Sequence, residues 1–164
     1  MLALERAKIS LLKARTITCF SGAGISAESG ISTYRDPLAG LWSQYDPEKL
    51  ETAKAFRENP RLVWGWYLWR RQQVARSQPN VAHRAFCQMA ATGRTVSIIT
   101  QNVDDLHERA GSHGVLHLHG SLATPKCFAC HRPAELAQDQ LAVPVEGALI
   151  EPPRCRRCGG KLRP

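Results

Sequence analysis

The sequence lacks a long hydrophobic run. None of its apolar stretches approaches the roughly 18 residues of a membrane-spanning helix. The opening stretch, MLALERAKISLLKA, carries charges at helical spacing where a signal peptide would have an apolar core. Internal repeats and low-complexity tracts are also missing. We therefore expect a soluble, cytoplasmic protein without a membrane partner.

Two common phosphate-binding signatures are missing as well. The glycine-rich stretch at residues 16–35 does not have the spacing G-x-G-x-x-G, because the glycine after Gly24 is Gly30, and no Gly-Lys-Ser/Thr follows. Instead, an apolar run at residues 16–20 opens into glycines and hydroxyls. This predicts a buried strand and a ligand loop, in which Gly22, Gly24 and Gly30 adopt φ values or close approaches that a Cβ would forbid. Taken alone, a plain tight turn explains the stretch equally well.

The composition favours one globular domain with a small appendage. A chain of 164 residues can bury one core, and its hydrophobic share of 43% excludes a disordered chain. The net charge of +8 invites nucleic-acid binding. However, the densest basic cluster, at residues 154–163, surrounds a cysteine pair and has no aromatic side chains for stacking. We therefore expect a solvated basic face or attraction to anionic ligands, and not a nucleic-acid partner.

The alternation of apolar and helical segments predicts an α/β fold. Residues 16–20, 95–100 and 115–118 have the composition of strands, and the helical segments between them imply βαβ units with a parallel sheet. Ligands bind beyond the carboxyl ends of such strands. Polar residues follow each strand: the glycine loop, then Gln101 to Asp104, then His119 to Ser121. We expect these three loops to meet at one cleft.

Three segments have a helical pattern. Residues 1–15 predict an amphipathic helix that packs on the following chain, and residues 61–77 predict a helix whose three tryptophans mostly lie in the core. Residues 80–93 predict a third helix. Its inward face is expected to consist of Phe86, Met89 and Ala90, with Gly93 as the C-cap.

Four of the six cysteines form two C-x-x-C pairs. Cys127 and Cys130 are followed, after 24 residues, by Cys155 and Cys158. This spacing is typical of two knuckles that close one tetrahedral thiolate site, so we expect a structural Zn²⁺; a redox dithiol is the alternative. The other two cysteines, Cys19 and Cys87, are expected to be buried small apolar residues.

These motifs together resemble a sirtuin, a family of NAD-dependent protein lysine deacylases. The resemblance spans the chain and implies an α/β fold, with a partial Rossmann-type parallel sheet and a small zinc-ribbon module. Residues 1–121 would be the N-terminal part of the NAD-binding domain, with the helical segment of about 37–78 in the small module, and residues 122–164 the zinc ribbon. Besides the paired cysteines, the matching segments are Gly22-Ala23-Gly24-Ile25-Ser26, Glu28-Ser29-Gly30-Ile31, Tyr34-Arg35, Thr100-Gln101-Asn102-Val103-Asp104, Leu106-His107, Ala110-Gly111 and Leu118-His119-Gly120-Ser121.

The resemblance also implies roles for single residues. His119 matches the general base, which deprotonates a ribose hydroxyl after nicotinamide has left. The hydroxyl then attacks the resulting imidate and the acyl group ends on ADP-ribose; a neutral imidazole suits that task. The other five histidines are interpreted as structural. The residues that match the NAD site are Gly22, Ala23, Gly24, Ile25, Tyr34, Arg35, Gln101, Asn102 and Asp104.

Tyr67 and Arg70 stand one helical turn apart. The pair resembles the Y-x-x-R motif of sirtuins that act on succinyl, malonyl or glutaryl lysine, in which the tyrosine and the arginine bind the acyl carboxylate. The alternative is a solvated arginine beside a core tyrosine. Glu51 departs from the pattern, since similar members usually carry a small residue there. A carboxylate pointing inward would crowd or repel an acidic acyl group.

A sirtuin continues beyond the position of Pro164 with further Rossmann strands that hold the adenosine half of NAD. The sequence is therefore expected to be a truncated member, with a sheet of about three strands, an exposed sheet face, low stability and weak NAD affinity. Its expected activity is removal of acetyl, and of succinyl or malonyl, from protein lysines. The alternatives are an inactive zinc-binding interaction fragment and ADP-ribosyl transfer. A dehydrogenase fits poorly, because no acidic residue follows the glycine loop at the ribose-binding place.

Overall fold

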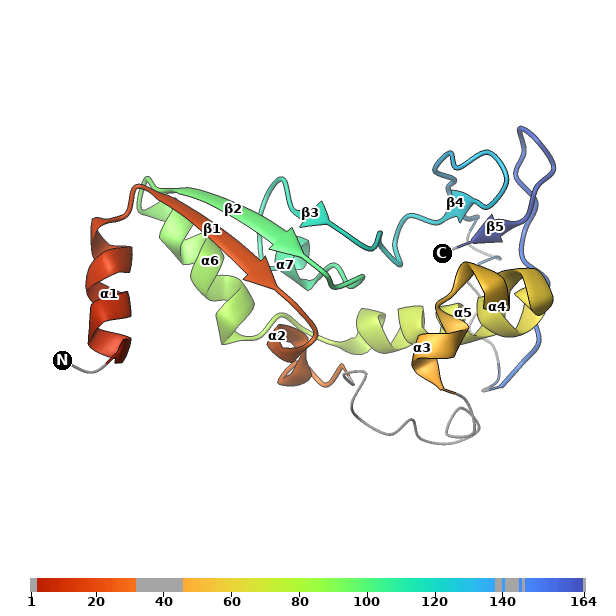
Figure 1. Ribbon diagram of the computed structural model, residues 1–164, viewed down its shortest axis with the longest axis horizontal. Coiled ribbons are helices and arrows are strands. Elements are labelled where there is room, and N and C mark those ends of the chain that lie inside the picture. Colours follow the sequence, from red (N-terminus) through yellow and green to blue (C-terminus); the bar gives the residue numbers. More distant parts are fainter. Residues whose placement is uncertain (1–2, 32–45, 138–139, 141–144, 146, 164) are drawn as a thin grey trace.

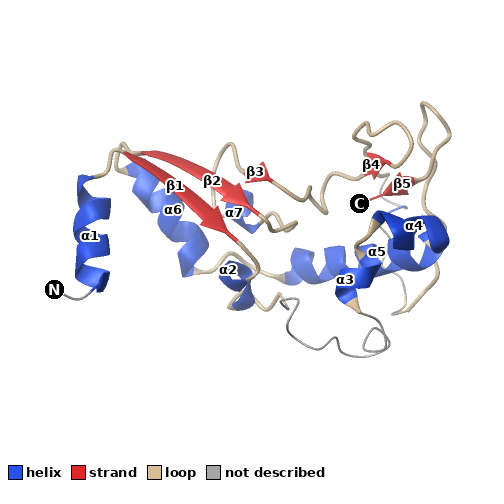
Figure 2. Cartoon of the chain, viewed as in Figure 1, coloured by secondary structure: helices blue, strands red, loops and turns tan. Residues whose placement is uncertain are grey.

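The computed structural model describes residues 3–31, 46–137, 140, 145 and 147–163. Its described elements form an elongated molecule with two groups, joined by the long helix α5 (Pro60–Arg76) (Figure 1). One group contains a parallel sheet with helices beside it, and the other contains short helices near a small two-stranded sheet (Figure 2). No helix among the described residues is long and apolar enough to cross a membrane.

The predicted parallel sheet is confirmed. Its order is β1 (Thr16–Ser21), β2 (Thr95–Thr100) and β3 (Leu116–His117), and both neighbouring pairs are parallel. Because the three strands run the same way, their carboxyl ends lie at one edge. Backbone hydrogen bonds continue past those ends, from the amide of Gln101 to the carbonyl of Ser21 at 3.0 Å and from the amide of Leu118 to the carbonyl of Thr100 at 2.9 Å. The loops that follow the strands are therefore held side by side.

Helices cover only one face of this sheet in the described part of the chain. The helices α6 (Val81–Ala91) and α7 (Leu106–Arg109) lie on that face (Figure 1). Burial consequently alternates along β1, where Ile17 and Ser21 are buried but Phe20 is 62% exposed. The prediction that β1 is buried is wrong for the face that carries Phe20. The expected sheet of about three strands with an exposed face is confirmed among the described residues.

Asn80 is the N-cap of α6, and its side chain accepts hydrogen bonds from the amides of Ala82 and His83. Gly93 follows the helix with φ of +83°, as expected of a glycine at a helix C-terminus. The predicted inward face is only partly right. Phe86 and Met89 are half-buried, but Ala90 is exposed, and the one fully buried side chain is that of His83.

The N-terminal helix α1 (Ala3–Lys13) contains no buried residue. Its apolar side is open, with Leu4 78% and Leu12 64% exposed. Arg94 holds its C-terminal end by donating to the carbonyls of Leu12 and Ala14, both at 3.2 Å. The helix is where the sequence predicts it, but the prediction that its apolar side is packed is wrong among the described residues.

At the other end, α5 divides two hydrophobic clusters. Trp66 and Tyr67 belong to one cluster, together with residues of α3 (Pro47–Leu50) and α4 (Ala53–Glu58). Trp64 and Leu68 belong to the other, which includes Cys127 of β4 (Lys126–Cys127) and Leu162 of β5 (Leu162–Arg163). These two strands pair antiparallel. The expected core role of Trp64 and Trp66 is confirmed, since each is 1% exposed.

Candidate active site and metal centre

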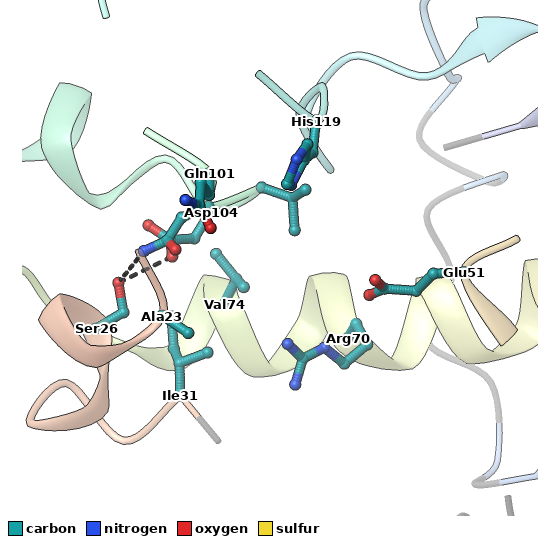
Figure 3. Close-up of a pocket in the computed structure, with 11 residues that line it drawn as sticks. Ala23, Ser26, Ile31, Glu51, Arg70, Val74, Gln101, Asp104 and His119 are labelled. Carbon is teal, nitrogen blue, oxygen red and sulfur yellow. Dashed lines mark hydrogen bonds between the residues drawn. The ribbon is translucent and has the colours of Figure 1, made fainter. Parts of the chain in front are cut away.

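The three loops after the parallel strands meet α5 around a cavity of about 360 Å³ (Figure 3). The cavity brings together six of the predicted site residues from four separate segments, and Glu51 from a fifth. Gly22, Gly24, Ile25 and Tyr67 do not line it, and Tyr34 and Arg35 lie outside the described residues. Its lining consists of Ala23, Ser26, Ile31, Glu51, Arg70, Val74, Gln101, Asn102, Val103, Asp104 and His119.

The glycine loop turns directly into a short helix, α2 (Gly24–Ala27). Ala23 already has right-handed helical angles, φ −52° and ψ −30°. A Cβ at Gly24 would meet no atom within 4 Å, and one at Gly22 would come only to 3.8 Å from Oε1 of Gln101. Among the three glycines, positive φ occurs at Gly30 alone, at +81°. The prediction of special backbone angles is therefore wrong for Gly22 and Gly24, because the helix begins there.

Ser26 connects the first two loops, and the sequence reasoning assigned it no role. The buried Oγ of Ser26 donates to Oδ2 of Asp104 at 2.9 Å and accepts from Nδ2 of Asn102 at 3.1 Å (Figure 3). The other oxygen of Asp104, Oδ1, accepts from the amide of Leu106 at 3.1 Å. One hydroxyl thereby fixes the amide and the carboxylate at the end of the cavity. Its only sequence signal was its position in the glycine motif.

His119 and His117 lie two residues apart and have different surroundings. His119 is exposed and its ring faces the cavity (Figure 3). His117 is engaged at both nitrogens, Nδ1 with the carbonyl of Asn102 at 2.8 Å and Nε2 with Oε1 of Glu108 at 2.7 Å. Burial lowers the pKa of His117, but the hydrogen bond to Glu108 and the one to Asn102 outweigh it, so the pKa is raised. Of these two histidines, only His119 is placed to reach a ligand in the cavity.

Two further histidines are buried behind the loops. His83 and His107 are 0% and 1% exposed, with ring centroids 4.9 Å apart. Nε2 of His107 lies 3.0 Å from Oγ of Ser21, which donates to Oγ1 of Thr100 at 2.9 Å. Burial lowers the pKa of both imidazoles, and for His83 the neighbouring His107 lowers it further. Both rings are therefore kept neutral, and they support the loops instead of facing the cavity.

The far end of the cavity is formed by α5 and the residue after α3. Arg70 lines the cavity, and its guanidinium lies 5.9 Å from the ring centroid of Trp66. Tyr67 lies one turn earlier and is 9% exposed, packed edge-on against Trp66. Glu51 also lines the cavity, and its carboxylate points inward (Figure 3). The inward carboxylate that the sequence left open is thus present.

The four paired cysteines form a compact sulfur cluster. Their Sγ atoms all lie within 4.8 Å of one another, with Cys127 and Cys158 at 3.4 Å and Cys130 and Cys155 at 4.0 Å. A tetrahedral Zn–S₄ site with bonds of about 2.3 Å has sulfur–sulfur edges of about 3.8 Å, whereas a disulfide is about 2.0 Å long. The residues therefore fit a closed, structural zinc site and not a disulfide.

The backbone around the cysteines suits this role. The amide of Cys130 approaches Sγ of Cys127 at 3.4 Å, and such amide contacts lower the pKa of the Cys127 thiol to about 6. A Cβ at Gly160 would lie 3.0 Å from Sγ of Cys127, so glycine is required there by close approach. The remaining cysteines are less buried than expected. Cys19 and Cys87 are half-buried, and Sγ of Cys87 lies 3.1 Å from Oγ of Ser112.

A loop cleft at the carboxyl edge of a parallel sheet, in a chain that also carries a closed four-cysteine metal site, defines a Rossmann-like α/β protein with a structural zinc module. A model of the Sir2 family matches residues 22–164. The chain belongs to the Sir2 family, the sirtuins, as its motifs led us to expect.

The chain is similar in sequence to several curated relatives over nearly its whole length. It is 70% identical over 155 residues to NAD-dependent protein deacylase 4 of Pseudomonas syringae pv. tomato, covering 94% of this chain and 60% of the relative. It is 64% identical over 161 residues to an NAD-dependent protein deacylase of Pseudomonas putida, covering 98% and 62%. The chain thus spans about 60% of the length of the curated relatives it matches.

Solved structures show the same fold. The crystal structure of a Sir2 homologue in complex with NAD superimposes with a TM-score of 0.83 at 43% identity. The match covers 98% of this chain and 59% of that chain. At this similarity the arrangement of sheet, α5 and cysteine hairpins is that of the family.

Proposed function

We propose that this chain carries the nicotinamide-ribose and acyl-lysine part of an NAD-dependent protein lysine deacylase. The observation that carries the proposal is one cavity that joins His119 to Ala23, Asn102 and Asp104 of the other two sheet loops. The substrates proposed are NAD and proteins with acetylated lysines in the cytoplasm, with succinyl or malonyl as further acyl groups. The relatives' names and the NAD-bound homologue support this assignment.

The residues have distinct tasks in this proposal. Ala23, together with Gly22, Gly24 and Ile25 of the same loop, binds the NAD substrate through the backbone. Tyr34 and Arg35, which lie outside the described residues, are proposed as further NAD-binding residues. Gln101, Asn102 and Asp104 receive nicotinamide and exclude water. Ser26 positions the last two by its hydrogen bonds of 3.1 and 2.9 Å.

The acyl oxygen of the substrate first attacks the ribose carbon that carries nicotinamide, and nicotinamide leaves. His119 then accepts the proton of a ribose hydroxyl, which attacks the acyl carbon of the resulting imidate. Addition of one water and cleavage of the carbon–nitrogen bond release the lysine amine and leave the acyl group on ADP-ribose. Arg70 lines the α5 side of the cavity and Tyr67 lies one helical turn before it, and the two are proposed to bind the acyl group. Cys127, Cys130, Cys155 and Cys158 hold the Zn²⁺ that keeps β4 and β5 against α5.

A mass-spectrometric assay with acetyl-lysine and succinyl-lysine peptides tests the proposal. We expect NAD-dependent loss of the acyl group, and we expect His119→Ala to lower the rate by about 10² to 10⁴-fold, the range for loss of a general base. His113→Ala is the matched control, because His113 is exposed and does not line the cavity. Turnover that survives His119→Ala unchanged would remove His119 from the mechanism. ADP-ribose appearing on protein instead of on the acyl group would favour ADP-ribosyl transfer.

A further inference from the structure

The end of the cavity away from Ser26 and Asp104 carries both signs of charge. Glu51 and Arg70 line this end, and Glu51 points its carboxylate into the space between them and the sheet loops (Figure 3). Glu51 is partly buried, between α3 and α4, and its place is set by the chain on both sides. An acyl group that enters along α5 therefore meets a fixed carboxylate as well as a guanidinium.

A second arginine, which belongs to β5, lies close to Glu51 and Tyr67. Arg163 of β5 donates from Nη2 to the backbone carbonyl of Glu51 at 2.5 Å, and its guanidinium lies 5.9 Å from the ring centroid of Phe128. These two contacts hold Arg163 beside Tyr67. The Glu51 side chain takes no part in the bond to Arg163, so a change at its carboxylate leaves that bond available.

The Tyr67 hydroxyl reports the balance of these charges. Its pKa is raised to about 12, first by burial and second by the negative charge of Glu51, while Arg163 and Arg70 act in the opposite direction. Glu51 therefore lies close enough to offset the positive charge that Arg70 and Arg163 bring to this end. The tyrosine stays protonated, and its hydroxyl is hydrogen-bonded with the Arg163 side chain.

We propose that Glu51 is a specificity-determining residue, which makes this site favour uncharged acyl groups over acyl groups that end in a carboxylate. The inference rests on the proposed function. A terminal acyl carboxylate beside Arg70 would share the space with the Glu51 carboxylate, and the repulsion from Glu51 together with the cost of desolvating the acyl carboxylate would outweigh the attraction of Arg70. An uncharged acyl group of the same size meets no such repulsion.

The repulsion between two unit charges about 5 Å apart, at an effective dielectric constant of about 20, weakens binding of the charged acyl group roughly a few hundredfold. Partial exposure and salt reduce this, so we expect an effect of about tenfold. The measurement is kcat/KM for peptides of one sequence that carry acetyl-lysine, succinyl-lysine or the terminal amide of succinyl-lysine. The amide matches succinyl in size and lacks its charge.

The purified protein should use the amide better than succinyl. Glu51→Gln should lower this amide-to-succinyl ratio about tenfold, and the ratio is the readout because both peptides are measured on the same variant. Glu58→Gln is the matched control, because Glu58 is exposed on α4, pairs with Lys54 at 3.9 Å and does not line the cavity. It should leave the ratio unchanged.

Each result decides a separate point. A wild-type preference for succinyl over the amide overturns the role of Glu51 without needing any variant. A ratio that Glu51→Gln leaves unchanged, with all peptides still turned over, overturns the role of Glu51 and leaves the deacylase function standing. Absence of turnover for every peptide in the wild-type protein overturns the deacylase function and the inference with it.

Discussion

Replacement of Gly65 by alanine should destabilise the protein, although alanine is the better helix former. Gly65 lies in α5, and a Cβ at this position would lie 2.0 Å from the carbonyl oxygen of Ala148 and 3.3 Å from its carbonyl carbon. An ordinary carbon–oxygen contact is about 3.3 Å or longer. The backbone around Ala148 would therefore have to move away from α5 by about 1 Å.

Three contributions decide the sign. Alanine in place of glycine stabilises a helix interior by about 1 kcal/mol. Overpacking at a well-packed contact costs about 1–3 kcal/mol. The displaced segment also strains the hydrogen bond from the amide of Ile150 to the carbonyl of Arg61, 3.1 Å long, which is worth about 1 kcal/mol. The sum is a loss of about 2 kcal/mol in the free energy of unfolding.

Urea unfolding with zinc present, followed by tryptophan fluorescence, measures this loss, since Trp64 and Trp66 flank the site. A loss of about 2 kcal/mol corresponds to a midpoint lower by about 1 M urea. Gly24→Ala is the control, because a Cβ there meets no atom within 4 Å, and its midpoint should barely change. A Gly65→Ala protein as stable as the wild type would show that α5 and the segment at Ala148 are not in contact as described.

Two further predictions concern the metal site and pH. Gly160→Ala places a Cβ 2.8 Å from that of Ala129 and 3.0 Å from Sγ of Cys127, so zinc affinity should fall about tenfold or more in competition with a chromogenic chelator; unchanged affinity would contradict the sulfur geometry. The pKa values of His83 and His107 are lowered in the folded protein. Below the pKa of about 6.5 that a histidine has in the unfolded chain, the unfolded chain therefore binds more protons than the folded protein. Unfolding free energy should therefore fall as pH drops from about 6.5 to 5, and His107→Asn, compared in the same zinc buffer, should show a shallower fall. Identical slopes for the two proteins would refute buried neutral rings. The raised pKa of His117 acts oppositely, with stability present below about 6.5 and lost as pH rises through its folded pKa.

Local pattern was enough to predict most of the secondary structure. The apolar β-branched run at residues 95–100, the proline-led helix from Pro60 and the C-x-x-C pairs each carry their signal within a few neighbouring residues. The convergence of three loops also followed from sequence, because parallel strands place their carboxyl ends together. Local pattern failed where burial depends on a second layer. Phe20 was expected inside and is exposed, because the described helices cover one sheet face only. Ala90 was expected on the inward side of α6 and is exposed at the end of that helix.

The sequence by itself determined the fold class, the four metal ligands and the identity of the loops that meet at the cleft, since these depend on composition and spacing along the chain. Tertiary structure alone decided which side chains touch. Ser26 meets Asp104 across 78 positions of the sequence, Arg163 meets Glu51 across 112, and Gly65 abuts Ala148. No local periodicity records such pairs, because each depends on how β1, α5 and the cysteine hairpins pack together. The charge at the end of the cavity formed by Glu51 and Arg70 is set by that packing.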